Sequence, residues 1–431
     1  KYINHIFICL SFTKIKKSPL FVFMQNKNKD KIINDPIYGF IKLDNGIILD
    51  LIDHPYFQRL RKISQLGLSY LVYPGAHHTR FHHALGAMHL MGKAVRLLRS
   101  KGHEITPEEE QAVNIAILLH DIGHGPFSHA LENSIVPGIN HEKLSREFMK
   151  VLNDEFKGEL ELAIQIFTNT YHKKFLHQLI SSQLDMDRLD YLRRDCFYTG
   201  VSEGQVNSER LITMLNVADD QLVVDSKGIY SVEKFIVARR LMYWQVYLHK
   251  TVLSAEFLLI KILMRAREVY SEDMVMPSML RRFIKENLPA DYEDLLPRYA
   301  QLDDYDIMTA IKEWQNHPDK VLSILSRKLL ERKLLGARVS EETEKDAKVE
   351  KMKACAASKY GISKEEARYF VFSETLTNNA YDPSRHRINL LYKDGTLQDI
   401  ASASDQLNIS ALTTPVTKNF LFFPKDCRDR R

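Results

Sequence analysis

The spacing of apolar residues changes along the chain and predicts a strand-like start, a long helical stretch and a mixed end. Residues 31–50 alternate apolar and polar positions around Asp35-Pro36 and Asn45-Gly46, which predicts short strands joined by turns. From Ile52 to about Lys285 the spacing is mainly helical. The helices expected there lie near residues 83–101, 107–119, 141–154, 174–195 and 231–269.

The clearest helix start is Thr106-Pro107, which three glutamates follow. A threonine cap, a proline in the first turn and acidic side chains at the positive end of the helix dipole all favour it. The helix that begins there ends at His120-Asp121.

The C-terminal part differs in character. Residues 300–357 are rich in charge and predict helices with solvated faces at 306–314, 319–335 and 341–357. Beyond them, residues 369–373 and 388–392 predict strands, and residues 393–396 predict a turn. We therefore expect a mainly α protein with a small α+β region at its end, which is structural or forms an oligomer contact.

Composition narrows the class of protein. With 431 residues, 45% of them hydrophobic and 27% charged, the chain is an ordinary globular protein, which excludes the disordered and fibrous classes. The net charge of +5 is too small to indicate nucleic-acid binding, but it fits a local basic cluster around an anionic substrate. No apolar run approaches the roughly 20 residues of a membrane-spanning helix. The chain begins at Lys1 and its first methionine is Met24, so we expect residues 1–30 to be a disordered or dispensable leader.

The four cysteines are far apart and form no CxxC pair; they are Cys9, Cys196, Cys355 and Cys427. This spacing predicts reduced thiols and a cytoplasmic protein rather than a disulfide framework or a structural zinc site.

The sequence around His120-Asp121 carries the strongest chemical signal. Gly123, His124 and His129 follow within nine residues. Imidazole and carboxylate together suit a divalent metal ion, and the extra histidines supply acid–base groups near neutral pH. The pattern predicts a hydrolytic metal centre.

Two other segments offer the missing ligands. His77, His78, His82 and His83 lie upstream, and spacing alone does not choose among them. Downstream, the segment 185–195 (DMDRLDYLRRD) packs four acids and three arginines into eleven residues. Positions four apart drift by only about 40° around a helix, so three of its residues share one face with Arg188 beside it. These three residues are Asp187, Tyr191 and Asp195.

A polar stripe is expected on the helix at 231–269. Its residues are spaced at i, i+4, i+8 and i+11 and are Arg239, Tyr243, Tyr247 and Lys250. Aromatic stripes usually face a core, but the charges at both ends need an anionic partner if they are buried.

Four blocks of sequence together resemble the HD-domain phosphohydrolases, and within them the deoxynucleoside triphosphate (dNTP) triphosphohydrolases. One member of that group is the human enzyme that joins a sterile-alpha-motif domain to an HD domain; bacterial stand-alone members are similar in length to this chain. The blocks are Lys31–Gly39, Asp53–Gly86, Leu118–His129 and Asp185–Asp195. The resemblance implies an HD-domain helical core at residues 31–270, a helical extension at 271–340 and an α+β C-terminal region at 341–431.

The resemblance also implies roles for individual residues. It makes His83, His120, Asp121 and Asp187 the ligands of one divalent metal ion per subunit, and leaves Mg, Mn, Fe and Zn open. His77 and His82 are then structural. The groups expected to grip the phosphates are Arg80, His124, His129, Arg188 and Arg239. His141 and Glu142 resemble the family's second His–acid catalytic pair, and Glu132 would orient the imidazole of His129.

The sugar and base contacts implied by the resemblance are Gln65, Leu66, Tyr191, Asp195, Tyr243 and Tyr247. Tyr247 would leave no space for a 2′-hydroxyl group. Leu248 departs from the human enzyme, which has a glutamine there near the base, so no base preference follows. The resemblance further implies a homodimer or homotetramer and an activating GTP or dNTP at Lys31, Asn34, Asp53, Gln58 and Arg61, although a structural network explains the last three equally well.

The expected reaction is hydrolysis of a dNTP to the deoxynucleoside and inorganic triphosphate. The arginines would stabilise the anionic transition state, and a protonated His129 or His141 would assist the leaving 5′-oxygen. The alternatives are hydrolysis of nucleoside monophosphates, cyclic nucleotides or guanosine tetraphosphate, or a role as a nucleotide-binding or nucleic-acid-binding regulator. Tyr191, Asp195 and Tyr247 favour the triphosphohydrolase, because only a site that reads the sugar needs them.

Overall fold

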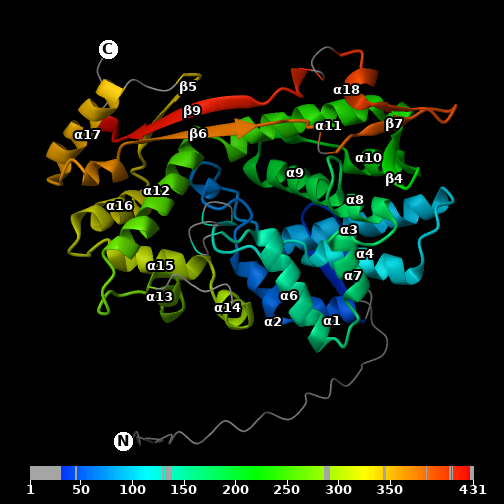
Figure 1. Ribbon diagram of the computed structural model, residues 1–431, viewed down its shortest axis with the longest axis horizontal. Helices are drawn as coiled ribbons and strands as arrows, with labels where there is room; N and C mark the ends of the chain where they lie inside the picture. Colours follow the sequence, from blue (N-terminus) through cyan, green and yellow to red (C-terminus); the bar gives the residue numbers. More distant parts are fainter. Residues whose placement is uncertain are drawn as a thin grey trace, which may run out of the picture.

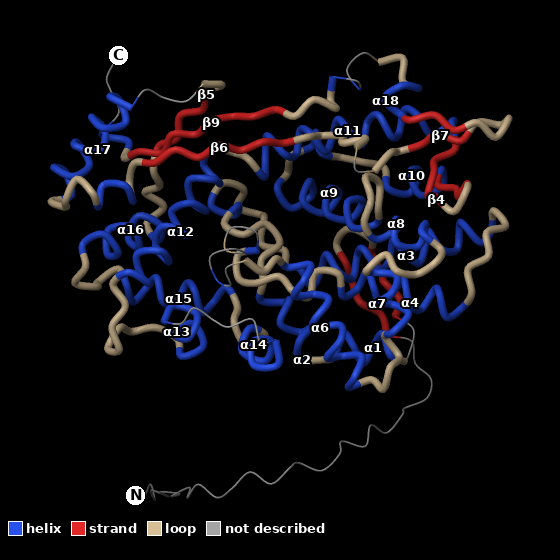
Figure 2. Tube along the Cα trace, viewed as in Figure 1, coloured by secondary structure: helices blue, strands red, loops and turns tan. Residues whose placement is uncertain are grey.

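The computed structural model confirms a mainly α fold (Figures 1 and 2). His129 and Glu132, two of the expected catalytic residues, lie outside the residues that it describes, as does Cys9. The described residues are 31–43, 46–128, 131, 135, 138–285, 292–342, 346–384, 386–406, 409 and 411–427.

The N-terminal part is a hairpin followed by a helical core. Strands β1 (Lys31–Asp35) and β2 (Gly39–Leu43) pair antiparallel, as the sequence predicts. The long helix α3 (Arg80–Ser100) packs against both α4 (Pro107–Leu119) and α9 (Met186–Thr199). Around these three helices lie α1 (Ile47–Asp53), α2 (Pro55–Gln58), α6 (His141–Glu155), α7 (Glu161–Phe167), α8 (Lys174–Ile180), α10 (Ser208–Met214), α11 (Ile229–Met242) and α12 (Lys250–Glu268), with the short 3-10 turns η1 (Arg59–Lys62), η2 (Ser69–Leu71), η4 (Ser202–Gly204) and η5 (Ser226–Gly228).

Local sequence fixes where the central helices begin and how closely they pack. Thr106 and Glu109 form a capping box at the start of α4, as the sequence predicts. Gly86 allows α3 to approach α9 closely, because a Cβ atom at this position would lie 2.0 Å from Asp190 Oδ1 and 2.2 Å from Arg194 Nη2. The close approach brings the first turns of both helices to one place.

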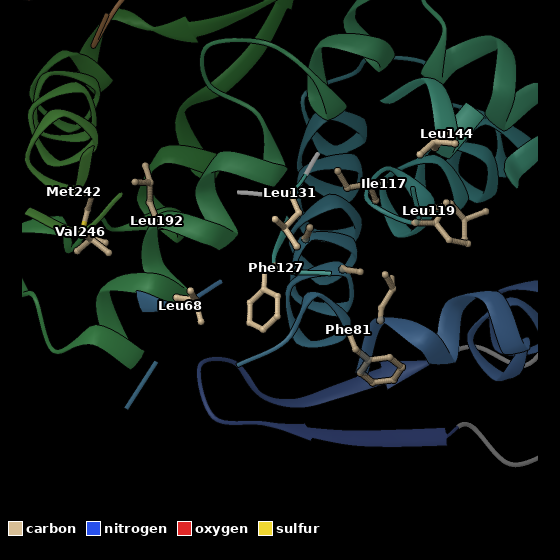
Figure 3. Packing of buried hydrophobic residues seen from close by; sticks show 14 of the residues in the cluster. Leu68, Phe81, Ile117, Leu119, Phe127, Leu131, Leu144, Leu192, Met242 and Val246 are labelled. Carbon is tan, nitrogen blue, oxygen red and sulfur yellow. The ribbon is translucent and has the colours of Figure 1, made fainter. Parts of the chain in front are cut away.

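The apolar core is continuous across these helices. Figure 3 shows buried side chains from elements far apart in sequence, among them Leu119 of α4, Leu144 of α6, Leu192 of α9 and Met242 of α11. Each of these four side chains is at most 2% exposed. Burial on this scale holds the helix ends that bear polar residues in fixed relative positions.

The C-terminal part adds helices and two sheets. One of its sheets has the antiparallel strand order β5-β9-β6; in the other, its strands β7 and β8 extend the hairpin of β3 (Leu215–Ala218) and β4 (Gln221–Asp225) in the order β3-β4-β7-β8. In Figure 1 the orange-to-red segment runs along one side of the molecule from α17 to β7 and α18. The elements are α13 (Ser278–Lys285), α14 (Tyr292–Tyr299), α15 (Asp304–Trp314), α16 (Lys320–Leu330), β5 (Gly336–Ser340), α17 (Asp346–Tyr360), η7 (Glu366–Tyr369), β6 (Phe372–Asn378), β7 (Asn389–Leu391), β8 (Leu397–Asp399), α18 (Ile400–Ala403), β9 (Val416–Phe423) and η8 (Lys425–Cys427).

Two expected helices are broken in the structure. The helix expected at 174–195 is interrupted because Asp185 caps a new helix, accepting the backbone N–H of Arg188 at 2.7 Å. The helix expected at 231–269 passes through a π-helical turn, η6 (Tyr243–Tyr247), and restarts after His249, whose ring caps α12. Both breaks lie beside residues expected in the active site.

Strands were missed inside the stretch expected to be helical. Strands β3 (Leu215–Ala218) and β4 (Gln221–Asp225) form a hairpin whose turn residues, Asp219 and Asp220, both have positive φ. Adjacent Asp residues tolerate this left-handed backbone better than most residues do. The predicted helix at 319–335 likewise ends at Leu330, before β5.

The expectation of reduced cysteines is wrong for one pair. Cys355 of α17 and Cys427 of η8 form a disulfide, although they lie 72 positions apart in the sequence. Their spacing gave no signal because strand β9 returns the chain to α17. Cys196 is a free, buried thiol. Among the described residues no helix is long and apolar enough to cross a membrane.

Candidate metal centre

Four side chains from three separate segments meet at the ends of α3, α4 and α9. His83 Nε2 lies 3.3 Å from His120 Nε2 and 3.1 Å from Asp187 Oδ1. His120 Nε2 lies 3.3 Å from Asp121 Oδ1 and 3.5 Å from Asp187 Oδ1. Ligands about 2.1 Å from one cation are separated by about 3 to 3.5 Å, and the ligand atoms of His83, His120 and Asp187, which all lie within 4.8 Å of one another, fit a single coordination sphere. The structure therefore brings three of the four expected ligands into one group. Asp121 adjoins this group at His120, but its ligand atom is grouped with those of His124 and His141.

Both imidazoles are oriented so that Nε2 faces the centre. His83 donates Nδ1–H to Asp190 Oδ2 at 2.8 Å, and His120 donates Nδ1–H to the carbonyl of Ile117 at 2.6 Å. These bonds keep a proton on Nδ1 and turn Nε2 toward the centre, where a bound metal ion would replace any proton that Nε2 carries. The two Nε2 atoms face each other across a gap that a cation fits, and the donor set of two imidazoles and two carboxylates suits a divalent metal ion.

A buried ion network supports His83 from behind. Arg194 donates from Nε and Nη2 to Asp190, each at 2.9 Å, and from Nη1 to Asp35 at 2.8 Å. Asp190 and Arg194 are both fully buried. Arg194 thus keeps Asp190 ionised against His83, and it ties the β1–β2 turn to the metal centre.

The electrostatics of the centre favour cations. Burial alone would lower the pKa of His83, but hydrogen bonds to Asp187 and Asp190 outweigh it and raise the pKa to about 10. Burial would raise the pKa values of Asp187 and Asp121, but the neighbouring histidines outweigh it and lower both. The carboxylates are therefore ionised, and any positive charge that enters is stabilised.

Arg80 and the second pair of histidines lie on the far side of Asp121. Arg80 Nη1 pairs with Asp121 Oδ2, and Asp121 Oδ1 lies 3.4 Å from His124 Nε2. The rings of His124 and His141 stack with centroids 3.8 Å apart. Burial, and after it the charge of Arg80, lowers the pKa of His124 well below 6.5, so this imidazole is neutral near pH 7.

The loop after the HD motif is held against α6. Gly123 donates its N–H to Ser145 Oγ at 2.9 Å, and Ser145 donates to the carbonyl of His120 at 2.6 Å. A Cβ atom at Gly123 would lie 2.3 Å from the carbonyl oxygen of His141, so only glycine fits there. Glu142, the acidic partner expected for His141, is exposed on the first turn of α6.

Two arginines face the same region with donors that a phosphate group can use. Arg188 is anchored by Nε to the carbonyl of Ser182 at 2.7 Å, and its Nη1 lies 3.4 Å from Tyr191 Oη. Arg239 donates Nη1 to Gln183 Oε1 at 2.8 Å, while its buried Nε has no hydrogen-bond partner among the described residues. This buried guanidinium N–H is therefore available to donate to an anion.

The three residues predicted to share a face lie on one helix, α9, and two of them contact Tyr247 of the π-helical turn. Tyr247 donates its hydroxyl to Asp195 Oδ2 at 2.8 Å, and its ring meets that of Tyr191 edge-on with centroids 6.2 Å apart. His78 donates to Asp195 Oδ1 at 2.7 Å. The stripe that was expected to continue to Lys250 does not, because the chain breaks after Tyr247 and Lys250 is exposed on the next helix.

Four other residues that the sequence points to make no hydrogen bond or ring contact with the candidate ligands within the described part of the chain: His77, His82, Gln65 and Leu66. His77 stacks on Tyr70, and His82 Nδ1 accepts the N–H of Thr79 at the start of α3, which fits their structural assignment. Gln65 Oε1 is buried without a partner among the described residues, and Leu66 is half-buried beside it.

The five residues expected to bind an activating nucleotide lie near the N-terminal hairpin and α2. Lys31 and Asp53 form an exposed ion pair at 3.2 Å, and Arg61 Nε donates to Gln58 Oε1 at 2.8 Å. Asn34 is exposed on β1. Their role as a nucleotide site stays a prediction.

Sequence reasoning missed the residues that support the ligands. They are Asp35, His78, Gln183, Asp190, Arg194 and Ser145. One signal was available for Asp190 and Arg194, since a glycine in the middle of a helix often marks a close approach, and Gly86 is the residue that they pack against.

Known proteins share both the sequence and the fold. Residues 80–195 match the family model of the HD domain, and residues 206–253 match that of an HD-associated region. The uncharacterised protein YwfO of Bacillus subtilis is 32% identical over 420 residues, which cover 93% of each chain. Human deoxynucleoside triphosphate triphosphohydrolase SAMHD1 is 31% identical over 264 residues, which cover 51% of this chain and 42% of the human protein.

A solved structure agrees over nearly the whole chain. A phosphohydrolase of Bacteroides thetaiotaomicron is 51% identical and superposes with a TM-score of 0.89, covering 92% of this chain and 100% of that one. The four candidate ligands fall at residues 83 to 187, inside the segment that matches the HD domain. The chain therefore belongs to the HD-domain phosphohydrolases, a family of metal-dependent hydrolases.

Proposed function

We propose that the protein hydrolyses deoxynucleoside triphosphates to the deoxynucleoside and inorganic triphosphate. The observation that carries this proposal is the contact of Tyr247 with Asp195, on the same face of α9 as Asp187. A carboxylate and two tyrosine rings beside a metal centre suit a sugar, whereas hydrolysis of a bare phosphate ester does not need them.

His83, His120, Asp121 and Asp187 would hold the divalent cation. When bound, such an ion supplies activation of water and neutralises charge at a phosphoryl oxygen. The triphosphate would be gripped by Arg80, Arg188 and Arg239, whose guanidinium groups are fixed before the substrate arrives. Fixed donors of this kind stabilise the charge that develops in the transition state.

The sugar would lie between Tyr191 and Tyr247, with its 3′-hydroxyl group on Asp195. Two donors, Tyr247 and His78, already hold this carboxylate in one orientation. The ring of Tyr247 would fill the space of a 2′-hydroxyl group. Gln65 would meet the nucleoside with its unpartnered Oε1 atom.

The leaving 5′-oxygen needs a proton donor. His124 is held neutral near pH 7, so we assign the donor to His129 or His141.

Product analysis tests the proposal directly. The purified protein is incubated with each dNTP and each ribonucleoside triphosphate, with Mg²⁺, Mn²⁺, Fe²⁺ or Zn²⁺, and products are separated by ion exchange. We expect deoxynucleoside and inorganic triphosphate in equal amounts, with little product from ribonucleotides. Release of single phosphates, or turnover only of monophosphates, cyclic nucleotides or guanosine tetraphosphate, would reject it.

Two matched variants probe the sugar contact. Tyr247→Phe keeps the ring and loses the bond to Asp195, while Tyr247→Ala also opens the space beside the 2′ position. We expect only the alanine variant to accept ribonucleotides at a rate approaching that for dNTPs.

Activation and assembly belong to the same proposal. A GTP or dNTP bound at Lys31, Asn34, Asp53, Gln58 and Arg61 would activate a homodimer or homotetramer. The assay is repeated with and without GTP while light scattering follows the mass. No change in rate or mass with any nucleotide would reject this part alone.

A further inference from the structure

Two loops that border the candidate site lie against each other. The first is Ser64–Gly67, which bears Gln65 and Leu66; the second is Gly125–Ser128, which follows the HD motif. A Cβ atom at Gly67 would lie only 3.3 Å from the carbonyl oxygen of Phe127, so the two backbones are in close contact.

Arg80 is tied to the junction of these loops. Its Nε donates to Ser128 Oγ at 2.8 Å, and Ser128 donates in turn to the carbonyl of Ser64 at 2.9 Å. The other end of the guanidinium group pairs with Asp121. A shift between the loops would therefore move Arg80 relative to the metal centre.

One carboxylate from the helical extension joins both loops. Asp304, the first residue of α15, accepts the backbone N–H of Ser64 on Oδ2 at 2.9 Å and that of Phe127 on Oδ1 at 2.8 Å. Its side chain is buried, with 8% of the residue exposed. Bonds from backbone N–H groups to an ionised carboxylate are among the stronger hydrogen bonds in proteins, and burial removes competing water.

The second loop needs such support. Phe127 and Ser128 both have φ of 52°, a left-handed conformation that side chains with a Cβ rarely adopt. Such a conformation persists only where its surroundings hold it. The neighbouring Asp303 has a different task, since it caps α15 and accepts the N–H of Tyr305 at 3.0 Å.

We propose that Asp304 is a positioning residue for the nucleotide site: it locks the Ser64–Gly67 loop to the Gly125–Ser128 loop and thereby sets the places of Gln65 and Arg80. The kinetic part of this inference rests on the proposed function, because Gln65 and Arg80 matter only if a nucleotide binds there. The structural part does not, because it concerns two backbone amides.

The test compares Asp304→Asn with Asp303→Ala. The asparagine has nearly the same shape but can accept only one of the two N–H groups, whereas the control removes the α15 cap and the 3.5 Å ion pair with Lys62 but leaves the Asp304 carboxylate in place. Hydrogen exchange is followed by mass spectrometry on the full chain, and Mn²⁺ binding is titrated. We expect exchange in residues 64–67 and 125–128 to rise at least tenfold in Asp304→Asn only, with one Mn²⁺ still bound.

Kinetics give the second readout. We expect kcat/KM for the best dNTP to fall about ten- to a hundredfold in Asp304→Asn, with a rise in KM, and to stay within twofold in Asp303→Ala. If Asp304→Asn does not fold, Asp304→Glu is tested in the same way, since it keeps the charge and displaces both bonds. The proposal would be overturned if the Asp304 variant showed the same hydrogen exchange and the same kinetics as Asp303→Ala. A wild-type protein that hydrolyses no nucleotide would reject the proposed function, while the exchange data would still decide whether Asp304 joins the loops.

Discussion

The replacement Asp190→Asn tests how far the metal centre depends on the network behind it. Asp190 accepts Nδ1–H of His83 at 2.8 Å and two N–H groups of Arg194 at 2.9 Å each. An asparagine has nearly the same shape, but its NH₂ group must face one of these donors. His83 would lose a charged partner, and Arg194 would keep only Asp35.

Two magnitudes follow. Loss of a carboxylate that orients a ligand histidine typically weakens metal binding about 10- to 100-fold, or about 1.4 to 2.7 kcal/mol. Breaking a buried ion pair costs about 3 to 5 kcal/mol of folding free energy, and we expect about 3 because Asp35 remains. Burial would raise the pKa of Asp190, but Arg194 and His83 lower it to about 2. The pKa of this carboxyl group is near 4 in the unfolded chain and about 2 in the folded protein. The ionised carboxylate therefore stabilises the fold fully above about pH 4, and this stabilisation is lost as the pH falls through about 2. At pH 7 the whole stabilisation is present.

Calorimetric titration of the metal-free protein with Mn²⁺ measures the change in metal affinity, and urea unfolding at pH 7 measures the change in folding free energy. Glu209→Gln is the control. It also removes one negative charge, but from an ion pair with Lys93 that is partly exposed to solvent. We therefore expect it to change the free energy of unfolding by less than about 0.5 kcal/mol. The reasoning is refuted if Asp190→Asn binds Mn²⁺ within twofold of wild type and unfolds like Glu209→Gln.

Three further predictions concern other parts of the molecule. Asp187→Ala should lose both the metal ion and turnover, which metal analysis after gel filtration and the product assay would show; full activity would contradict the ligand assignment. Burial raises the pKa of Glu256 from 4.5 to about 8, because the folded protein favours the neutral carboxyl group. The contribution of Glu256 to the stability of the wild type is therefore highest below about pH 4.5, and this advantage is lost as the pH rises through about 8. Glu256→Gln should therefore gain stability over wild type between pH 5 and 9, by at most about 5 kcal/mol, and parallel urea-unfolding curves at each pH would contradict this. Reduction of Cys355–Cys427, which closes a 72-residue loop, should lower stability by up to about 4 kcal/mol; an unchanged melting temperature with dithiothreitol, with Cys355→Ser as control, would argue against the bond.

The candidate metal ligands could be found in the sequence because their spacing reflects local geometry. His120-Asp121 ends a capped helix, and Asp187 shares one face of the next ligand-bearing helix with Asp195. The choice of His83 among four nearby histidines required the family resemblance. The structure gives the physical reason: Nε2 of His83 reaches His120 and Asp187, whereas His82 faces back to cap its own helix.

The supporting residues could not be predicted because their partners are distant in sequence. Asp304 meets Ser64 and Phe127 across 240 and 177 residues. The break after Tyr247 was also hidden, since an apolar helical pattern continues through it and only the π-helical turn shows where the stripe ends. Periodicity predicts which face of a helix is buried, but not where tertiary packing interrupts the helix.

Anomalous diffraction from crystals grown with Mn²⁺ tests the central claim most directly. One peak is expected at the meeting point of α3, α4 and α9, about 2.0 to 2.3 Å from both Nε2 atoms and from one oxygen of each aspartate, Asp121 and Asp187. A peak elsewhere, or an ion there that leaves His83 or Asp187 uncoordinated, would contradict the four-ligand centre on which the proposed function depends.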